Sequence, residues 1–259
     1  LPPTHEPLTP NPEPLTMAPP FFLFPGLACT ERLFAPQKDA WSNWVEVIVP
    51  SWVEPCRGET LDAFARRWAE AVWEAYFVSG KYPREEGCYV GGLSFGGMVA
   101  PIVGEFLMER GVRVKYAFRI STVRCGDEIP PFHRILWRLL YFFPGGGWYP
   151  AKIFCWLVLQ LFSRQISFAR REVYQQVLDT PVERCRQVVR MLSAWHSPLQ
   201  EYPFPFFQIH GEDDSLLPLK YTSPDVVLKR AGHCLTLTRS EEVNQLIGTI
   251  LQTVEETSS

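Results

Sequence analysis

The segment Gly91–Gly97, with the sequence GGLSFGG, carries the residues of this chain best suited to chemistry. It lies between an apolar run typical of a buried strand and a second apolar run typical of a helix. A serine with a glycine two residues to either side, at a strand-to-helix turn, is the pattern of a nucleophile elbow. Glycine is needed at the flanking positions because side chains there would collide with the strand and the helix. Ser94 is therefore the candidate nucleophile, since the alternative role of a helix N-cap does not require glycine on both sides.

A carboxylate and a histidine follow Ser94, each just past a predicted strand. Asp214 lies in the loop after the strand Phe204–Ile209, and His233 follows the next strand, Val226–Leu228. In a parallel sheet covered by helices, reactive residues gather at the carboxyl ends of the strands. A histidine there can take the proton of the serine hydroxyl, while a carboxylate orients the imidazole and stabilises its charged form. We therefore expect acyl transfer through a covalent intermediate on Ser94.

The identity of the acid stays open among three aspartates. Asp213 competes with Asp214 because a turn can shift by one residue, and the pair is also good turn chemistry. Asp127 is a third candidate because it follows an earlier predicted strand.

The other residues near the motifs are interpreted as structural. His210 ends a strand and suits a structural hydrogen bond better than proton transfer. His133 and His196 are expected to cap helices or to face solvent. Cys234, beside the candidate base, is interpreted as a packing residue because the serine occupies the elbow.

The elements that must position these residues alternate between strands and helices. Such alternation predicts a parallel sheet of about six strands with helices on both faces. Apolar runs bounded by turn residues predict the strands, and apolar residues at helical spacing predict the helices. The predicted strands are Pro20–Phe24, Trp44–Val49, Cys88–Val90, Tyr116–Ile120, Phe204–Ile209 and Val226–Leu228, and the main predicted helices are Thr60–Phe77, Ser94–Arg110 and Glu241–Val254.

One segment, 127–198, interrupts this alternation and is helical in pattern. We interpret it as a helical cap inserted into a core made of residues 20–126 and 199–259. Residues 1–19 are expected to be a disordered leader, because the first 20 residues hold eight prolines and almost no apolar periodicity. Met17, just before the first predicted strand, is a candidate start of the native protein.

The cap segment is rich in aromatic and aliphatic residues, which predicts an apolar pocket and a small apolar substrate. Its run Ile153–Phe162 is too short to cross a bilayer. We favour a cap whose apolar face covers the mouth of the site. The alternative is docking on a lipid surface, helped by the basic residues Arg134, Arg138, Lys152 and Arg164.

The composition is that of a globular protein and excludes some partners. Hydrophobic residues make up 46% of the 259 residues and charged residues 20%. The net charge of -3 argues against a nucleic-acid surface. The seven cysteines are scattered without a CxxC pair, which predicts reduced thiols, a cytoplasmic location and no zinc site.

From about Pro20 to Val254 the chain resembles the α/β-hydrolase superfamily, and within it a branch of small bacterial hydrolases. The motifs PGLACTERLF, GGLSFGGMVA, IHGEDDSLLP and AGHCL carry the resemblance. The order serine, acid, histidine is that of the superfamily. The resemblance implies that Ser94 is the nucleophile, that His233 is the general base, and that Asp214, three residues past the glycine of HG, is the acid.

The resemblance also implies an oxyanion hole made of two backbone N–H groups. One belongs to Phe95, the residue after the nucleophile. The other belongs to Leu27 or Ala28, after Pro25-Gly26, where many superfamily members have His-Gly. One such donor is typically worth about 3–4 kcal/mol of transition-state stabilisation.

The expected function is therefore a serine hydrolase that cleaves a carboxylic ester, or a thioester or amide, with no metal or organic cofactor. A lyase or a cofactor-free oxygenase using the same three residues is one alternative. A non-catalytic protein of the same fold that binds a small ligand is the other, because a fold alone does not determine a function. Haloalkane dehalogenation is not expected, since it needs a carboxylate at the elbow.

Overall fold

The structure is a computed structural model, which describes residues 17–142 and 167–258. Most of the expected leader, the apolar run Ile153–Phe162 and two basic residues of the expected cap, Lys152 and Arg164, lie outside the described residues.

A six-stranded parallel sheet forms the centre of the molecule and confirms the predicted fold class. Its order is β2-β1-β3-β4-β5-β6, and each neighbouring pair is parallel. All six predicted strands are present. Their bounds are β1 Pro20–Phe24, β2 Glu46–Ile48, β3 Cys88–Leu93, β4 Val114–Ile120, β5 Phe206–Gly211 and β6 Val226–Leu228.

The fifth strand begins two residues later than predicted. Pro205 precedes it, and a proline has no N–H to donate to a ladder. Its carbonyl still accepts a hydrogen bond from the adjacent strand, since Ala117 N lies 2.9 Å from Pro205 O. The proline therefore marks the edge of regular pairing rather than the middle of the strand.

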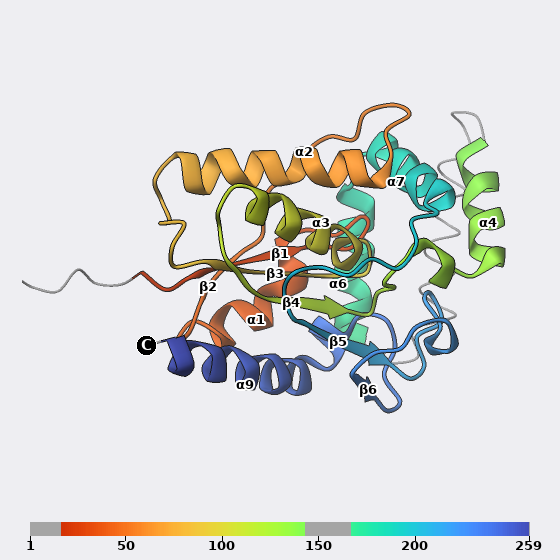
Figure 1. Cartoon of the computed structure of the whole chain (residues 1–259). Helices are drawn as coiled ribbons and strands as arrows, with labels where there is room; N and C mark the ends of the chain where they lie inside the picture. Colours follow the sequence, from red (N-terminus) through yellow and green to blue (C-terminus); the bar gives the residue numbers. More distant parts are fainter. Residues whose placement is uncertain (1–16, 143–166, 259) are drawn as a thin grey trace, which may run out of the picture.

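Helices cover both faces of the sheet (Figure 1). One face carries α2, Leu61–Trp73, which a π-helical turn, Glu74–Val78, extends, together with α3, Phe95–Glu109. The opposite face carries α1, Ala35–Ala40, and α9, Ser240–Ser258.

Further helices follow β4 and precede β5. They are α4, Pro131–Phe142, α6, Ser167–Asp179, and α7, Val182–Ala194. These three helices gather beyond the carboxyl ends of the strands (Figure 1). A short helix, α8, Leu235–Thr238, precedes α9.

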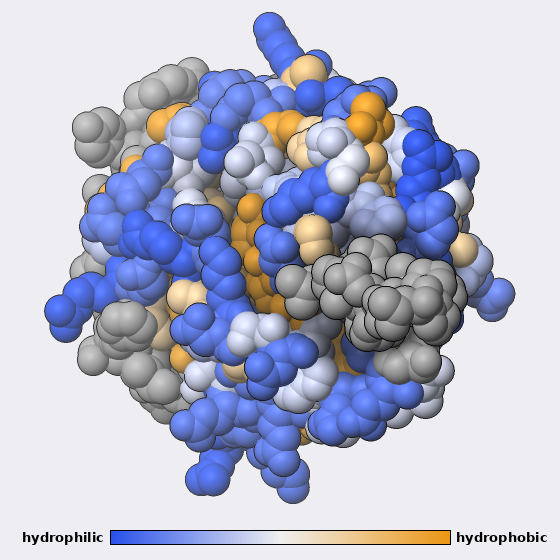
Figure 2. Space-filling model, turned by 90° about the vertical axis from the view of Figure 1, so that its left-hand side faces the viewer, coloured by the Kyte–Doolittle hydropathy of each residue, from blue (hydrophilic) through white to orange (hydrophobic). Residues whose placement is uncertain are grey.

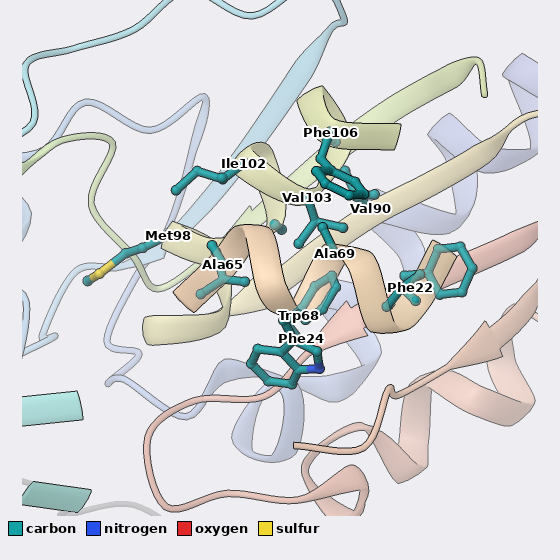
Figure 3. Packing of buried hydrophobic residues seen from close by; sticks show 14 of the residues in the cluster. Phe22, Phe24, Ala65, Trp68, Ala69, Val90, Met98, Ile102, Val103 and Phe106 are labelled. Atoms are coloured by element: carbon teal, nitrogen blue, oxygen red, sulfur yellow. The ribbon is translucent and has the colours of Figure 1, made fainter. Parts of the chain in front are cut away.

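The apolar run of β1 is continuous because both faces of this strand are buried. Phe22 and Phe24 belong to the core between the sheet and α2–α3, whereas Phe21 and Leu23 belong to the core under α1 and α9. Trp68 of α2 packs edge-on against Phe24, with ring centroids 5.0 Å apart. Figure 3 shows this core with residues of α2, α3, β1 and β3: Phe22, Phe24, Ala65, Trp68, Ala69, Val90, Met98, Ile102, Val103 and Phe106. Strands buried on both faces lose the polar–apolar alternation, as the sequence predicted for a parallel sheet.

Candidate active site

Ser94 lies at the turn between β3 and α3 with φ 56° and ψ −119°. A positive φ at a residue other than glycine is a strained conformation that costs on the order of 1–3 kcal/mol. The end of β4 holds this turn in place: Ser94 N donates to Ile120 O over 2.9 Å, and Thr122 Oγ1 donates to Ser94 O over 2.6 Å. Backbone and hydroxyl contacts from the neighbouring strand therefore stabilise the strained serine.

The glycines around Ser94 are required by close approach of the backbone. A Cβ added to Gly92 would lie 2.4 Å from Gly96 C, and one added to Gly96 would lie 1.9 Å from Phe24 O. At Gly97 a Cβ would lie 2.6 Å from the Thr122 side chain. Because backbone atoms cannot move aside as a flexible side chain can, the steric reason inferred from the motif holds in the structure.

A hydrogen bond joins the predicted acid and the predicted base. His233 Nδ1 lies 2.7 Å from Asp214 Oδ2, while Asp214 Oδ1 accepts the N–H groups of Leu216 and Leu217 at 3.0 and 2.9 Å. The Asp214 side chain is fully buried and the His233 side chain is 12% exposed. Since a carboxylate only accepts, Nδ1 carries the proton, which leaves Nε2 of the neutral ring as an acceptor. This is the tautomer that a general base needs.

The two competing aspartates are not in this position. Asp213 and Asp127 are exposed, and neither bonds to His233 in the described residues. Ser94 follows β3 while Asp214 and the base follow β5 and β6, so the three residues lie beyond the same edge of the sheet. Within the described residues no hydrogen bond joins the Ser94 hydroxyl to His233. The acid and the base are therefore in direct contact, whereas Ser94 is related to them by its position at the same edge of the sheet.

The loop after β1 lies directly against the elbow. A Cβ added to Gly26 would lie 3.5 Å from Ser94 Cβ. Ala28 has φ 59°, and Cys29 N donates to Gly26 O over 3.0 Å, which closes a tight turn. This turn brings the backbone of Leu27 and Ala28, the candidate oxyanion donors, to the same end of the sheet as the nucleophile.

The other candidate donor, Phe95, is held by its aromatic side chain. Its ring is buried and stacks on Trp52, with centroids 5.8 Å apart and planes 6° apart. The ring of Phe64 in α2 packs against the same residue at 5.8 Å. Because the side chain is fixed on two sides, the backbone at the start of α3 is fixed as well.

Comparison with known families agrees with this geometry. A model described as "Alpha/beta hydrolase family" matches residues 15–246. The chain belongs to this family. Comparison with curated proteins gives no match.

Solved structures of other hydrolases are similar to this chain over almost its whole length. An esterase from Thermogutta terrifontis with malate bound has a TM-score of 0.70 and 19% identity, covering 92% of this chain and 91% of that chain. A bromoperoxidase from Bacillus anthracis has a TM-score of 0.69 and 15% identity, covering 91% and 92%. An esterase from Exiguobacterium antarcticum has a TM-score of 0.70 and 12% identity, covering 92% and 93%. At these identities the likeness shows the α/β-hydrolase fold alone.

A second histidine of this α/β-hydrolase touches the acid. His210 Nε2 lies 2.7 Å from Leu217 O and 3.3 Å from Asp214 Oδ2, and both side chains are fully buried. Because a carbonyl only accepts, Nε2 carries the proton, and the buried Nδ1 has no hydrogen-bond partner among the described residues. Burial lowers the pKa of His210, while the charge of Asp214 opposes this shift. The structural hydrogen bond predicted for His210 is present, but its contact with the acid was not predicted.

One interpretation of the helical segment is wrong. His133 does not face solvent: it is half-buried on α4, its ring stacks on Trp137 at 5.8 Å and 19°, and its Nδ1 is buried without a hydrogen-bond partner. Burial lowers the pKa of His133, and the charge of Asp214 acts in the opposite direction. The position of His133 differs from the expected one because its ring stacks on Trp137, an apolar neighbour on α4, and is partly buried there. His196 is exposed, as predicted.

Most thiols of the described residues are buried or half-buried packing groups, and Cys56 is exposed. None of the six described cysteines forms a disulfide. Cys234 contacts a small apolar cluster with Ala28, Val173 and Cys185, and burial raises its pKa to about 12. A buried thiol of this kind is a poor nucleophile, which agrees with the packing role predicted for it. The cytoplasmic location stays a prediction.

The part of the chain that the structure describes offers neither a metal site nor a helix that could span a membrane. There, no group of three His, Cys, Asp or Glu residues could hold a metal ion. None of the helices there is long and apolar enough to cross a membrane. Arg134, one of the four basic residues proposed for lipid docking, instead donates to Trp195 O over 2.7 Å and to Gly126 O.

A surface cavity of about 430 Å³ lies at the opposite edge of the sheet. Its lining includes Val45, Val47, Tyr76 and Lys81 and follows the whole length of the edge strand β2. Seen from this side, hydrophilic side chains surround a narrow apolar strip (Figure 2). None of Ser94, Asp214 and His233 lines this cavity, so it does not belong to the candidate active site.

Proposed function

We propose that this α/β-hydrolase is a serine hydrolase that cleaves a carboxylic ester of a small apolar molecule. The observation that carries the proposal is the buried hydrogen bond between Asp214 and His233 beyond the sheet edge where Ser94 sits at a strained turn. A serine at such a turn and a histidine oriented by a buried carboxylate are the parts that acyl transfer requires. A thioester or an amide would use the same parts.

In the proposed mechanism the reaction has two halves. Nε2 of His233 takes the proton of the Ser94 hydroxyl while Oγ attacks the carbonyl carbon of the ester. The negative charge that develops on the carbonyl oxygen is stabilised by the N–H groups of Phe95 and of Leu27 or Ala28. His233 then gives its proton to the leaving alcohol, and a water molecule, activated by the same imidazole, releases the acid from Ser94.

The surroundings of the acid support its role as an orienting group. Asp214 accepts two backbone N–H groups and the Nδ1–H of His233, at 2.7 to 3.0 Å, with no cation of Lys or Arg bonded to it in the described residues. Hydrogen bonds from three donors stabilise a carboxylate that has been removed from water. The carboxylate can then stabilise the imidazolium that forms on His233 during the reaction.

We also propose that α4, α6 and α7 act as a cap over this site, within the expected segment 127–198. Leu27 and Trp137 are partly buried against the main core, and Leu27 also contacts the small cluster of α6 and α7. Apolar side chains around the oxyanion loop favour an apolar acyl group or alcohol.

The experiment is a comparison of Ser94→Ala with wild type on p-nitrophenyl esters of graded acyl length. We expect Ser94→Ala to lower kcat/KM at least about 1,000-fold, because the covalent intermediate is lost. Ser42→Ala is the matched control: in the part of the chain that the structure describes, Ser42 Oγ donates only to Asp39 O on the surface, so activity should be unchanged.

A fluorophosphonate probe gives an independent readout. Wild type and Ser42→Ala should be labelled, and Ser94→Ala should not. Substantial turnover by folded Ser94→Ala, or the absence of labelling in folded wild type, would overturn the proposed function.

A further inference from the structure

A buried glutamine of α6 contacts the backbone of the loop that carries the candidate oxyanion donors. Gln176 Oε1 accepts the backbone N–H of Thr30 over 2.7 Å and lies 3.2 Å from Thr30 Oγ1. The Gln176 side chain is completely buried. Thr30 closes the loop that begins at Gly26, so this contact reaches from the helical segment into the candidate oxyanion loop, across 146 residues of sequence.

Both ends of the Gln176 amide are used. Its Nε2 donates to Glu172 Oε1 over 3.2 Å, and the same carboxylate pairs with Arg32, which follows the loop. Arg32 also lies 3.6 Å from Asp179 at the end of α6. The backbone carbonyl of Gln176 accepts a hydrogen bond from Thr180 Oγ1 over 2.8 Å. Because an amide whose donor and acceptor are both occupied has one orientation, this network fixes the position of Oε1.

Apolar contacts support the same arrangement. Ala28, which has φ 59°, packs in one buried cluster with Val173 and Val177 of α6 and with Cys185 of α7. A left-handed conformation at alanine persists only where the surroundings stabilise it. In the described residues those surroundings are the turn within the loop and the side chains of the two helices.

We propose that Gln176 is a positioning residue for the oxyanion hole. By accepting the Thr30 N–H it holds the loop from Gly26 to Thr30 so that Leu27 or Ala28 presents its N–H to the carbonyl oxygen of the substrate. The inference rests on the proposed function, and it gives α6 a second role: the helix completes the catalytic machinery as well as covering it. A loop that shifts when Gln176 is lost weakens an interaction made in the transition state, so the effect falls on kcat rather than on KM.

The experiment compares three variants on α6. Gln176→Leu removes the acceptor at nearly constant volume, and Gln176→Glu, made together with Glu172→Gln so that two carboxylates do not meet, keeps an oxygen acceptor for Thr30. Gln175→Leu is the matched control, because the Gln175 side chain is exposed and, within the described residues, hydrogen-bonds only to Asp179. We expect Gln176→Leu to lower kcat by about 10-fold to 100-fold, less than complete loss of an oxyanion donor, with KM changed less than about 3-fold. The double variant should recover at least part of kcat, and Gln175→Leu should match wild type.

Amide hydrogen exchange supplies a readout that does not depend on activity. In Gln176→Leu the Thr30 amide should exchange at least about 10-fold faster than in wild type, while in Gln175→Leu it should be unchanged. Faster exchange with unchanged kcat would overturn the positioning role, and so would unchanged exchange. If wild type hydrolyses no ester and takes up no fluorophosphonate, the proposed function fails, and the exchange rate of Thr30 still decides whether Gln176 holds the loop.

Discussion

Ser94 and Ala28 are both in the left-handed region, with φ 56° and 59°, yet the structure stabilises them in different ways. Ser94 is held by the sheet itself, through the end of β4 and the backbone around the glycines. Ala28 is held by side chains of α6 and α7, which belong to the segment between β4 and β5. The nucleophile is therefore positioned by the core, whereas the candidate oxyanion loop depends on α6 and α7, which lie outside the core.

The largest expected effect comes from replacing the acid, Asp214, which belongs with Ser94 to the part of the site that the core positions. Asp214→Asn keeps the shape of the side chain but removes the charge, and an asparagine can hold His233 in the wrong tautomer. We expect kcat to fall by about 10⁴-fold, as is typical for such a change in a serine triad. Asp213→Asn is the matched control, because Asp213 is exposed one residue away, and it should retain wild-type kcat. Equal losses in the two variants would contradict the assignment of Asp214.

A second, smaller effect is expected on stability when the elbow around Ser94 is changed. The Cβ of Gly96→Ala would lie 1.9 Å from Phe24 O, a backbone atom of a central strand. We expect the free energy of unfolding to fall by more than about 4 kcal/mol, measured by urea denaturation, because neither backbone can yield. Gly248→Ala on α9 is the control: its nearest neighbour lies at 3.6 Å, so the added methyl should be neutral or should stabilise the helix by up to about 1 kcal/mol.

The smallest expected effect is the pH dependence that His210 adds to stability. The buried ring has a lowered pKa and stays neutral in the folded protein, whereas the unfolded chain takes up a proton as the pH falls below 6.5. Stability is therefore complete above pH 6.5 and declines below it, by at most about 1.4 kcal/mol per pH unit for one group.

The variant His210→Gln tests this slope. Glutamine does not titrate, so urea denaturation between pH 6.5 and 5.5 should show a shallower decline than wild type. His133, whose pKa is also lowered by burial, keeps its own part of the slope in this variant. A slope identical to that of wild type would contradict the buried neutral state inferred for His210.

The sequence predicted the parts of the site that local patterns specify. The elbow requires glycines because of contacts within a few residues of Ser94, and the strands show their burial in uninterrupted apolar runs such as β1. Fold class, strand number and strand order along the chain were predictable for the same reason.

The contacts of Gln176 and His210 were not predictable in this way. Gln176 reaches Thr30 across 146 residues, and no periodicity on α6 distinguishes it from the exposed Gln175 beside it. His210 and Asp214 are four residues apart, but only the turn between them brings Nε2 to the carboxylate. His133 was expected to cap a helix or to face solvent, because its stacking on Trp137 depends on how α4 packs, which a helical pattern alone does not specify.

The distance along the chain between the candidate nucleophile and base also has a consequence for synthesis. Ser94 leaves the ribosome first, and His233 follows 139 residues later, the difference between their positions. At about 5–20 residues per second, roughly 7–28 s pass between the two. During this interval the growing chain carries a serine without its base, so the proposed hydrolase stays inactive until His233 has been made.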